Sequence, residues 1–224
     1  MRNDIVVDDY ILKNADPTAY YVSDFISESE ENYILSNIYS APKPKWTQLS
    51  NRRLQNWGGI PHKKGMIAEV IPHWLQTYLN KIHDLNLMGG NKPNHVLVNE
   101  YLPGQGILPH VDGDLFYPTI TTISLGSHII LRFMEPLDDG MRLAFQFLLE
   151  PRSLLVLQEK LFTHYLHCIL EIKEDIIDDS ILNLNMCSEK YVKGLRLKRD
   201  TRVSLTIRHV PKTTSFKLGI GNKK

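Results

Sequence analysis

The sequence predicts an α+β fold, in which N-terminal helices flank a β-sandwich or jelly roll. Two observations predict it: amphipathic helical segments come first, and short β-branched segments separated by Pro, Gly and Asp follow. The chain has 224 residues, of which 42% are hydrophobic and 23% charged, as in an ordinary globular protein. We expect one domain over 1–224, with the helices at about 20–93 and the strands at about 94–210.

The first helix is expected after a short strand, within residues 20–42 (YYVSDFISESEENYILSNIYSAP). Ser27 and Glu30 have the spacing of a capping box, in which each side chain binds a backbone N–H of the first turn. The apolar stripe expected on this helix consists of Tyr33, Ile34, Leu35 and Ile38.

Residues 72–85 (PHWLQTYLNKIHDL) predict a second amphipathic helix, with Pro72 at its start. Its apolar residues are Trp74, Leu75, Tyr78, Leu79, Ile82 and Leu85. Between the helices, residues 42–65 are rich in Pro, Gly and basic side chains, which is typical of a loop or an irregular hairpin.

Six segments of β-branched or alternating residues predict the strands. They are 95–102, 119–127, 128–135, 142–150, 153–158 and 202–210. The polar stretch from 171 to 200 separates the last two and predicts a long surface insertion.

Composition limits the cellular setting. The chain has two cysteines, Cys168 and Cys187, and acidic residues near the N-terminus where a secretory signal has an apolar run. No apolar run approaches the roughly 18 residues that cross a membrane. We expect a monomer in the cytoplasm and nucleus, without a membrane partner.

Charge is segregated along the chain although the net charge is only +1. Residues 41–68 contain six basic side chains and no acidic one, whereas residues 134–189 contain eleven acids and four bases. The basic six are Lys43, Lys45, Arg52, Arg53, Lys63 and Lys64. This pattern indicates a cationic face, although the field of the whole molecule does not favour nucleic acid.

His110 and Asp112, in the stretch LPHVDGD, are candidate ligands of one metal ion. On a strand, residues i and i+2 point to the same face, roughly 7 Å apart at Cα. A facial triad needs a second histidine, and THYLHCI offers His164 and His167. We favour His167, which lies between apolar residues shortly after a predicted strand. The alternative for each histidine is a hydrogen-bonded structural role.

Two further strands carry polar faces. Asn99 and Tyr101 share one face of the segment 95–102, and both can donate hydrogen bonds to an anion. In RVSLTIR, Val203, Leu205 and Ile207 alternate with a polar set made of Arg202, Ser204, Thr206 and Arg208. The outer arginines, about 20 Å apart at Cα, could bracket a small dicarboxylate. The alternative for both strands is a solvent-facing polar side.

In chain order, N-x-Y, H-x-D, a distal His and R-x-S-x-T-x-R resemble the AlkB-like iron(II)- and 2-oxoglutarate-dependent dioxygenases. Their last element is R-x-N-x-T-x-R, so Ser204 replaces an asparagine and reaches less far. The segments APKPKWTQLSNRRLQNWGG, NHVLVN, ISLGSH and EPRSLLVL resemble one branch of that family. The resemblance extends from about Tyr20 to Val210.

The resemblance implies a double-stranded β-helix (jelly roll) core that uses Fe(II), 2-oxoglutarate and O2. It implies that the iron ligands are His110, Asp112 and His167. It also implies that Arg202 binds the distal carboxylate of 2-oxoglutarate with help from Tyr101. More peripheral contacts are implied for Asn99, Ser204 and Arg208. The implied reaction converts 2-oxoglutarate to succinate and CO2 and hydroxylates an N-methyl group, which leaves as formaldehyde.

The implied substrate is nucleic acid, single-stranded or duplex, held by an N-terminal nucleotide lid. Candidate residues are Trp46 and Trp57 for stacking on a base, with Arg52 and Arg53 for phosphates. The alternative is a solvated basic loop whose tryptophans pack into the core. Two other functions stay open: the same chemistry on a protein or small molecule, and a nucleic-acid-binding module without turnover. A zinc hydrolase would have no use for the arginine strand.

Overall fold

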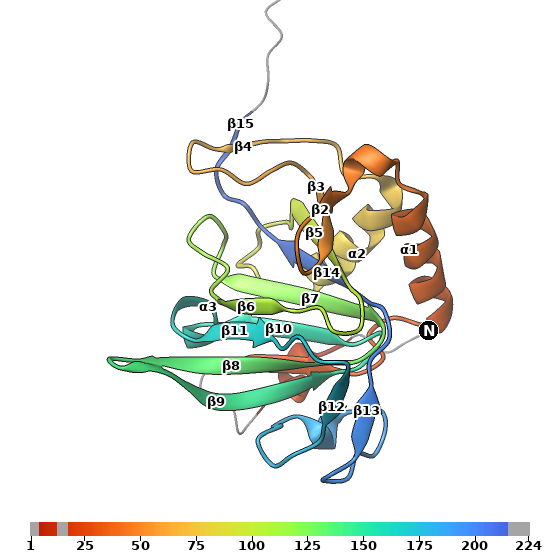
Figure 1. Cartoon of the computed structure of the whole chain (residues 1–224). Helices are drawn as coiled ribbons and strands as arrows, with labels where there is room; N and C mark the ends of the chain where they lie inside the picture. Colours follow the sequence, from red (N-terminus) through yellow and green to blue (C-terminus); the bar gives the residue numbers. More distant parts are fainter. Residues whose placement is uncertain (1–4, 13–17, 215–224) are drawn as a thin grey trace, which may run out of the picture.

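Two facing antiparallel sheets form the centre of the protein, as the computed structural model shows for residues 5–12 and 18–214 (Figure 1). The large sheet has the order β1 (Ala19–Val22), β10 (Leu154–Gln158), β7 (Thr119–Gly126), β14 (Arg202–Arg208), β5 (His95–Tyr101), β3 (Arg53–Trp57) and β2 (Thr47–Gln48). The small sheet has the order β6 (Ile107–His110), β11 (Leu166–Ile169), β8 (Ile129–Leu137) and β9 (Gly140–Leu149). This arrangement confirms the expected jelly roll.

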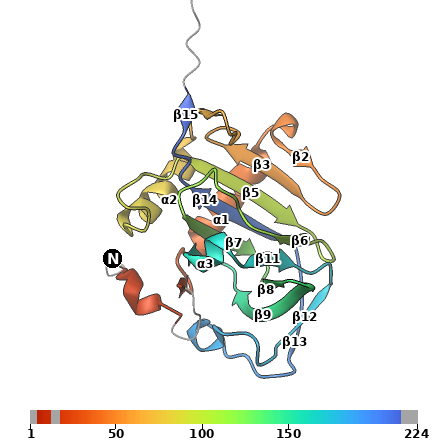
Figure 2. The same ribbon diagram turned by 90° about the vertical axis from the view of Figure 1, so that its left-hand side faces the viewer.

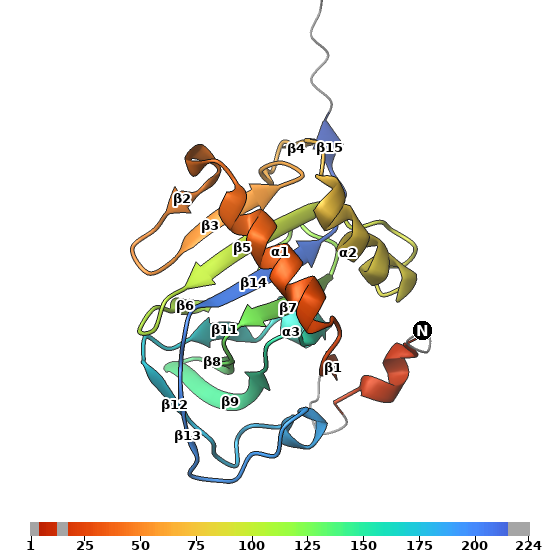
Figure 3. The same ribbon diagram turned by 90° about the vertical axis from the view of Figure 1, so that its right-hand side faces the viewer.

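Two helices cover the outer face of the large sheet (Figure 3). They are α1 (Glu28–Ser40) and α2 (His73–Asp84). The capping box of α1 is formed: the Ser27 N–H donates to Glu30 Oε2 at 2.8 Å, and the Glu30 N–H donates to Ser27 Oγ at 3.3 Å. Ile34 is buried, but Tyr33 is 54% exposed, because one residue turns about 100° around the helix. The expected apolar stripe is therefore narrower than predicted.

The helices and the large sheet enclose the first apolar core. From the helices it receives Ile34, Ile38, Leu75, Leu79 and Ile82, and from β5 and β14 it receives Val96, Val98, Val203, Leu205 and Ile207. A second core fills the space between the two sheets and includes Phe133, Phe145, Phe147, Leu155 and Ile169. Both faces of the large sheet are thus covered, so polar side chains on its inner face are removed from bulk water.

The basic segment between the helices forms a hairpin, as expected. β2 pairs with β3, and β3 continues the large sheet along β5 (Figure 2). The remaining short elements are η1 (Val7–Tyr10), η2 (Lys43–Lys45), the parallel pair β4 (Met66–Ile67) and β15 (Thr213–Thr214), and α3 (Lys160–Thr163). In the described ranges, no helix is both long and apolar enough to cross a membrane.

The stretch from 171 to 200 is more ordered than the predicted polar insertion. It contains β12 (Glu174–Ile176), η3 (Leu184–Met186) and β13 (Arg196–Lys198), and β12 pairs with β13. Ile177 and Ile181 are buried against Ile130 and Leu148 of the small sheet. The expectation of an irregular surface loop is wrong here, because isolated apolar residues in a polar stretch are enough to dock it.

A buried ion pair fastens this stretch. Arg199 donates two hydrogen bonds of 2.7 Å to Asp175, and both side chains are 2% exposed. Burial works against ionisation of Asp175, but the hydrogen bonds from Arg199 and His128 outweigh it and hold the pKa of this carboxyl below its ordinary value.

Replacing Arg199 by alanine leaves the Asp175 carboxylate buried without its partner. We expect Arg199→Ala to lower the free energy of unfolding by roughly 3–5 kcal/mol in urea denaturation at pH 7. Arg196→Ala is the matched control three residues earlier, on β13, because the Arg196–Glu174 pair is largely exposed and its loss costs about 1 kcal/mol or less. Equal losses in the two variants would contradict the prediction.

Candidate active site

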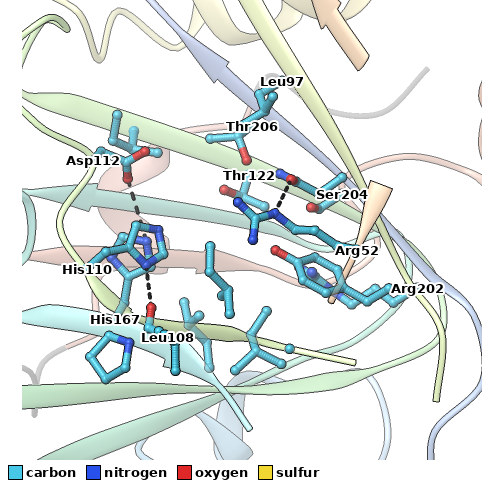
Figure 4. A pocket seen from close by; sticks show the side chains of 18 of the residues that line it. Arg52, Leu97, Leu108, His110, Asp112, Thr122, His167, Arg202, Ser204 and Thr206 are labelled. Carbon is cyan, nitrogen blue, oxygen red and sulfur yellow. Dashed lines mark hydrogen bonds and ion pairs between the residues drawn. The ribbon is translucent and has the colours of Figure 1, made fainter. Parts of the chain in front are cut away.

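A cavity of about 490 Å³ lies between the two sheets (Figure 4). Its floor is the inner face of β5 and β14, and its opposite wall includes β6 and β11. Side-chain alternation along β14 decides which residues reach it. Val203, Leu205 and Ile207 face the helices, and the polar set lines the cavity: Arg202, Ser204, Thr206 and Arg208. The alternative of a solvent-facing polar strand is therefore wrong, since Arg202 and Arg208 are only 3% and 7% exposed.

Arg202 marks one end of the cavity. Its Nη2 donates a hydrogen bond of 3.0 Å to Ser124 Oγ on β7, and its guanidinium carbon lies 5.9 Å from the ring centre of Tyr101. Burial lowers the pKa of Arg202 to about 10, and no carboxylate of the described residues pairs with its charge. Its Nε is also buried, with no hydrogen-bond partner in the described part of the chain. A guanidinium that is buried without a carboxylate partner is stabilised by binding an anionic ligand.

Arg208 marks the other end. Its Nη2 lies 3.3 Å from Asp112 Oδ1, and its guanidinium carbon lies 4.3 Å from the ring centre of Phe116. Its Nε is buried without a partner, and burial lowers its pKa. Arg208 was expected only as a peripheral contact of the co-substrate. The structure gives it a direct contact with a predicted metal ligand.

The three predicted metal ligands meet beside Arg208. His110 and His167 face each other across the β6–β11 pairing, with ring centres 4.4 Å apart. Asp112 Oδ2 lies 3.7 Å from His167 Nε2. His164, the other candidate histidine, is exposed at the end of α3 and does not line the cavity.

The geometry of H-x-D differs from expectation in one respect. β6 ends at His110, so Asp112 follows the strand rather than belonging to it, and Val111 is 40% exposed. Asp112 reaches His167 from the segment that follows the strand. The carboxylate is shared between Arg208 and His167.

The residues present fit an iron site. Two imidazoles and one carboxylate are the ligand set of Fe(II) oxygenases with open coordination positions. His110 Nδ1 lies 2.8 Å from the Leu108 carbonyl, so Nδ1 carries the proton and Nε2 keeps its lone pair for a metal. Burial lowers the pKa of His167 to about 4, which keeps it neutral. The donor atoms are nevertheless not arranged around a common point: the described residues contain no group of three His, Cys, Asp or Glu positioned to hold an ion.

Asn99 and Tyr101 lie on the cavity floor as predicted, and Glu100 points to the opposite side of β5. Arg52 is the one member of the predicted substrate set that enters the cavity, where its Nε donates to Asn99 Oδ1 at 3.2 Å. Ser204 pairs in register with Asn99 and shares the same floor.

The other predicted substrate residues lie away from the cavity. Arg53 forms a bidentate pair with Glu100, with N–O distances of 2.6 and 2.8 Å, and its guanidinium lies 4.1 Å from the ring centre of Trp46. Trp57 packs edge-on against Trp74 of α2. Alternation along β3 places Arg53 and Trp57 on the face opposite to the cavity. Trp46 and Trp57 both pack against the core beneath the helices, which confirms the alternative of tryptophans packed against the core.

His95 shares the inner face of β5 with Asn99 and Tyr101, although it does not line the cavity itself, and it belongs to none of the motifs in the sequence. It precedes Asn99 by four positions on β5, so the period of two could have identified it. It is 1% exposed, its Nε2 lies 3.3 Å from Asn56 Oδ1, and its Nδ1 has no partner. Burial, followed by the charge of Arg208, lowers its pKa to about 3. Ser124, the partner of Arg202, was also missed, since only the β7–β14 pairing places it there.

Residues 27–208 match the model of the 2OG-Fe(II) oxygenase superfamily. The chain belongs to this superfamily. It is therefore a dioxygenase that uses Fe(II), 2-oxoglutarate and O2, and the predicted chemistry is confirmed.

Individual relatives support an AlkB-like subgroup. The chain is 49% identical to a zebrafish (Danio rerio) protein named "Probable RNA/DNA demethylase ALKBH6", over 96% of this chain and 94% of that protein. It is 27% identical to the Xenopus tropicalis "tRNA (carboxymethyluridine(34)-5-O)-methyltransferase alkbh8", over 95% of this chain and 35% of that protein.

Solved structures share the fold at low identity. OsALKBH1 matches with a TM-score of 0.55 at 15% identity, covering 88% of this chain and 100% of the other. A prolyl-4-hydroxylase from Pseudomonas putida matches with a TM-score of 0.54 at 15% identity, covering 93% of this chain and 97% of the other.

The buried neutral state of His95 predicts a pH dependence of stability. The pKa of His95 is about 3 in the folded protein and about 6.5 when exposed, so between these values the unfolded chain binds a proton that the folded chain does not. Stability therefore falls as the pH falls from 6.5. The free energy of unfolding of wild type minus that of His95→Gln should decrease by about 2 kcal/mol between pH 7 and pH 5 in urea titrations. An unchanged difference would contradict the prediction.

Proposed function

We propose that this dioxygenase oxidatively demethylates nucleic acid, with His110, Asp112 and His167 as the iron ligands. The observation that carries the site assignment is the contact of these side chains with one another at one end of a cavity whose other end holds Arg202, a buried guanidinium that forms no ion pair with the described residues. Iron held there supplies the oxidising chemistry when it is bound together with 2-oxoglutarate and O2. The nucleic-acid substrate is supported by the name of the zebrafish relative, a probable RNA/DNA demethylase.

The protein residues of the cavity bind and orient the co-substrate. Arg202 and the Tyr101 hydroxyl can bind the distal carboxylate by charge-assisted hydrogen bonds. Ser124 holds the Arg202 guanidinium in place through the 3.0 Å hydrogen bond. The Asn99 amide can donate a hydrogen bond to the co-substrate from the floor of the cavity. Arg208 orients the Asp112 carboxylate. Apolar side chains between the sheets exclude water from this space.

The charge of the cavity also supports an anionic substrate. Apart from the two histidines, its charged lining consists of the guanidiniums of Arg52, Arg202 and Arg208 and the carboxylate of Asp112, a net charge of +2. A divalent ion and a dianionic co-substrate cancel each other, so the loaded site keeps this positive charge. A phosphodiester chain carries the complementary charge.

Asp112→Ala tests the iron assignment. Wild type, reconstituted anaerobically with Fe(II) and 2-oxoglutarate and then given O2, should form succinate. Asp112→Ala should reduce the rate at least about 100-fold, because losing a direct ligand should cost no less than the roughly 10–100-fold cost of losing a residue that only supports a ligand. His164→Ala is the matched control, because this histidine lies three residues from His167 but is exposed and outside the cavity. Equal succinate from wild type and Asp112→Ala would remove the assignment.

The substrate proposal is tested with methylated single- and double-stranded DNA and RNA. We expect at least one of the four to release formaldehyde in step with succinate, and its binding to weaken as salt increases, because phosphate contacts release counterions. Formaldehyde release from methylated protein or a small molecule, with none from the nucleic acids, would establish the alternative function instead.

A further inference from the structure

Arg52 enters the cavity from the hairpin at the edge of the large sheet. It belongs to the turn that connects β2 and β3, whereas the other two cavity arginines belong to β14. Figure 4 shows its side chain extending into the cavity next to Ser204 and Thr122. Its neighbour Arg53 is neutralised by Glu100, but within the described residues Arg52 forms no ion pair.

The contact between Arg52 and Asn99 orients both side chains toward a ligand. The Arg52 Nε–H donates to Asn99 Oδ1, so the Asn99 amide nitrogen is left to donate elsewhere. The terminal nitrogens of Arg52 form no hydrogen bond with the described residues. Burial raises the pKa of Tyr101, and the positive charges of Arg202 and Arg52 both oppose that rise. The two guanidiniums are therefore both near enough to the Tyr101 hydroxyl to stabilise negative charge there.

The floor beneath Arg52 is made of short side chains. Ser204 pairs in register with Asn99 on one side and with Ser124 on the other, and Thr206 pairs with Thr122. A serine at 204 offers only a short hydroxyl to a ligand and leaves space above it. The Arg52 guanidinium occupies this part of the cavity.

We propose that Arg52 is a second positive contact for 2-oxoglutarate beside Arg202, in place of a longer polar side chain at position 204, and that it thereby couples the β2–β3 hairpin to co-substrate binding. This inference rests on family membership for the co-substrate itself. The ligand must be anionic, because three guanidiniums and one carboxylate line the cavity. A carboxylate near Tyr101 and Asn99 would receive donors from β5, β14 and the hairpin together.

Isothermal titration calorimetry of 2-oxoglutarate into the anaerobic, Mn(II)-loaded full chain tests the contact without turnover. We expect Arg52→Ala to weaken binding by about 10-fold, the scale of a lost charge-assisted hydrogen bond, and Arg52→Lys to weaken it less. Lys43→Ala is the matched control, because it removes a charge from the same basic segment outside the cavity. Thermal unfolding checks that each variant is folded.

A double-mutant cycle with Ser204→Asn tests whether Arg52 takes the place of a longer side chain at position 204. In the Arg52→Ala background, Ser204→Asn should increase the affinity for 2-oxoglutarate at least threefold. In wild type the same substitution should give no gain, because Arg52 already fills the space. Additive effects of the two substitutions would contradict the proposal, because independent sites add.

Hydrogen exchange of the hairpin tests the coupling. Binding of 2-oxoglutarate should slow amide exchange in residues 47–57 of wild type and leave it unchanged in Arg52→Ala. Unchanged 2-oxoglutarate affinity in Arg52→Ala, with weakened nucleic-acid binding, would overturn the proposal and assign Arg52 to a substrate phosphate. Failure of wild type to bind 2-oxoglutarate would instead count against the family function of the site.

Discussion

The alternation of side chains along β14 is the constraint on which the rest of the structure depends. The strand is central in the large sheet, between β7 and β5, so both of its faces are covered. Its apolar residues contribute to the core beneath α1 and α2, and this fixes which side of the strand faces the helices. The opposite side is then obliged to carry Arg202 and Arg208 into the interior. Their desolvation is a cost that packing alone does not offset, and it makes the cavity an anion site.

The two ends of β14 compensate this cost differently, which divides the cavity into two functional parts. Arg208 has Asp112 as its counterion, so the positive charge at the end of the cavity with the predicted metal ligands is neutralised before any cofactor binds. Among the described residues, Arg202 contacts the Ser124 hydroxyl and the Tyr101 ring but no carboxylate. A carboxylate ligand is therefore stabilised more strongly beside Arg202 than beside Arg208. The same strand thus orients a metal ligand at one end and binds an anion at the other.

The hairpin β2–β3 connects this interior to the outer surface. Arg53 pairs with Glu100 on the outer side of the sheet, and Arg52 reaches Asn99 on the inner side. Neighbouring arginines therefore hold the hairpin to both sides of β5. The outer pair, with Trp46 stacked on Arg53, has a structural role. The inner contact places a positive side chain from the basic segment where the co-substrate binds, which links the part of the chain expected to meet nucleic acid with the chemistry beneath it.

The sequence by itself determined the local features: the α1 capping box, the alternation on β5 and β14, and the ordered motif of His110, Asp112 and His167. These depend on spacing within single elements, whose periodicity is fixed by backbone geometry. Only the tertiary structure decided the rest. The pairing of β6 with β11 brings the two histidines together, and the pairing of β7 with β14 supplies Ser124. The tertiary structure also decided that Arg52 points into the cavity while Trp46, Arg53 and Trp57 point away from it. The pairing of the short hairpin with β5 determines which of its side chains face the cavity.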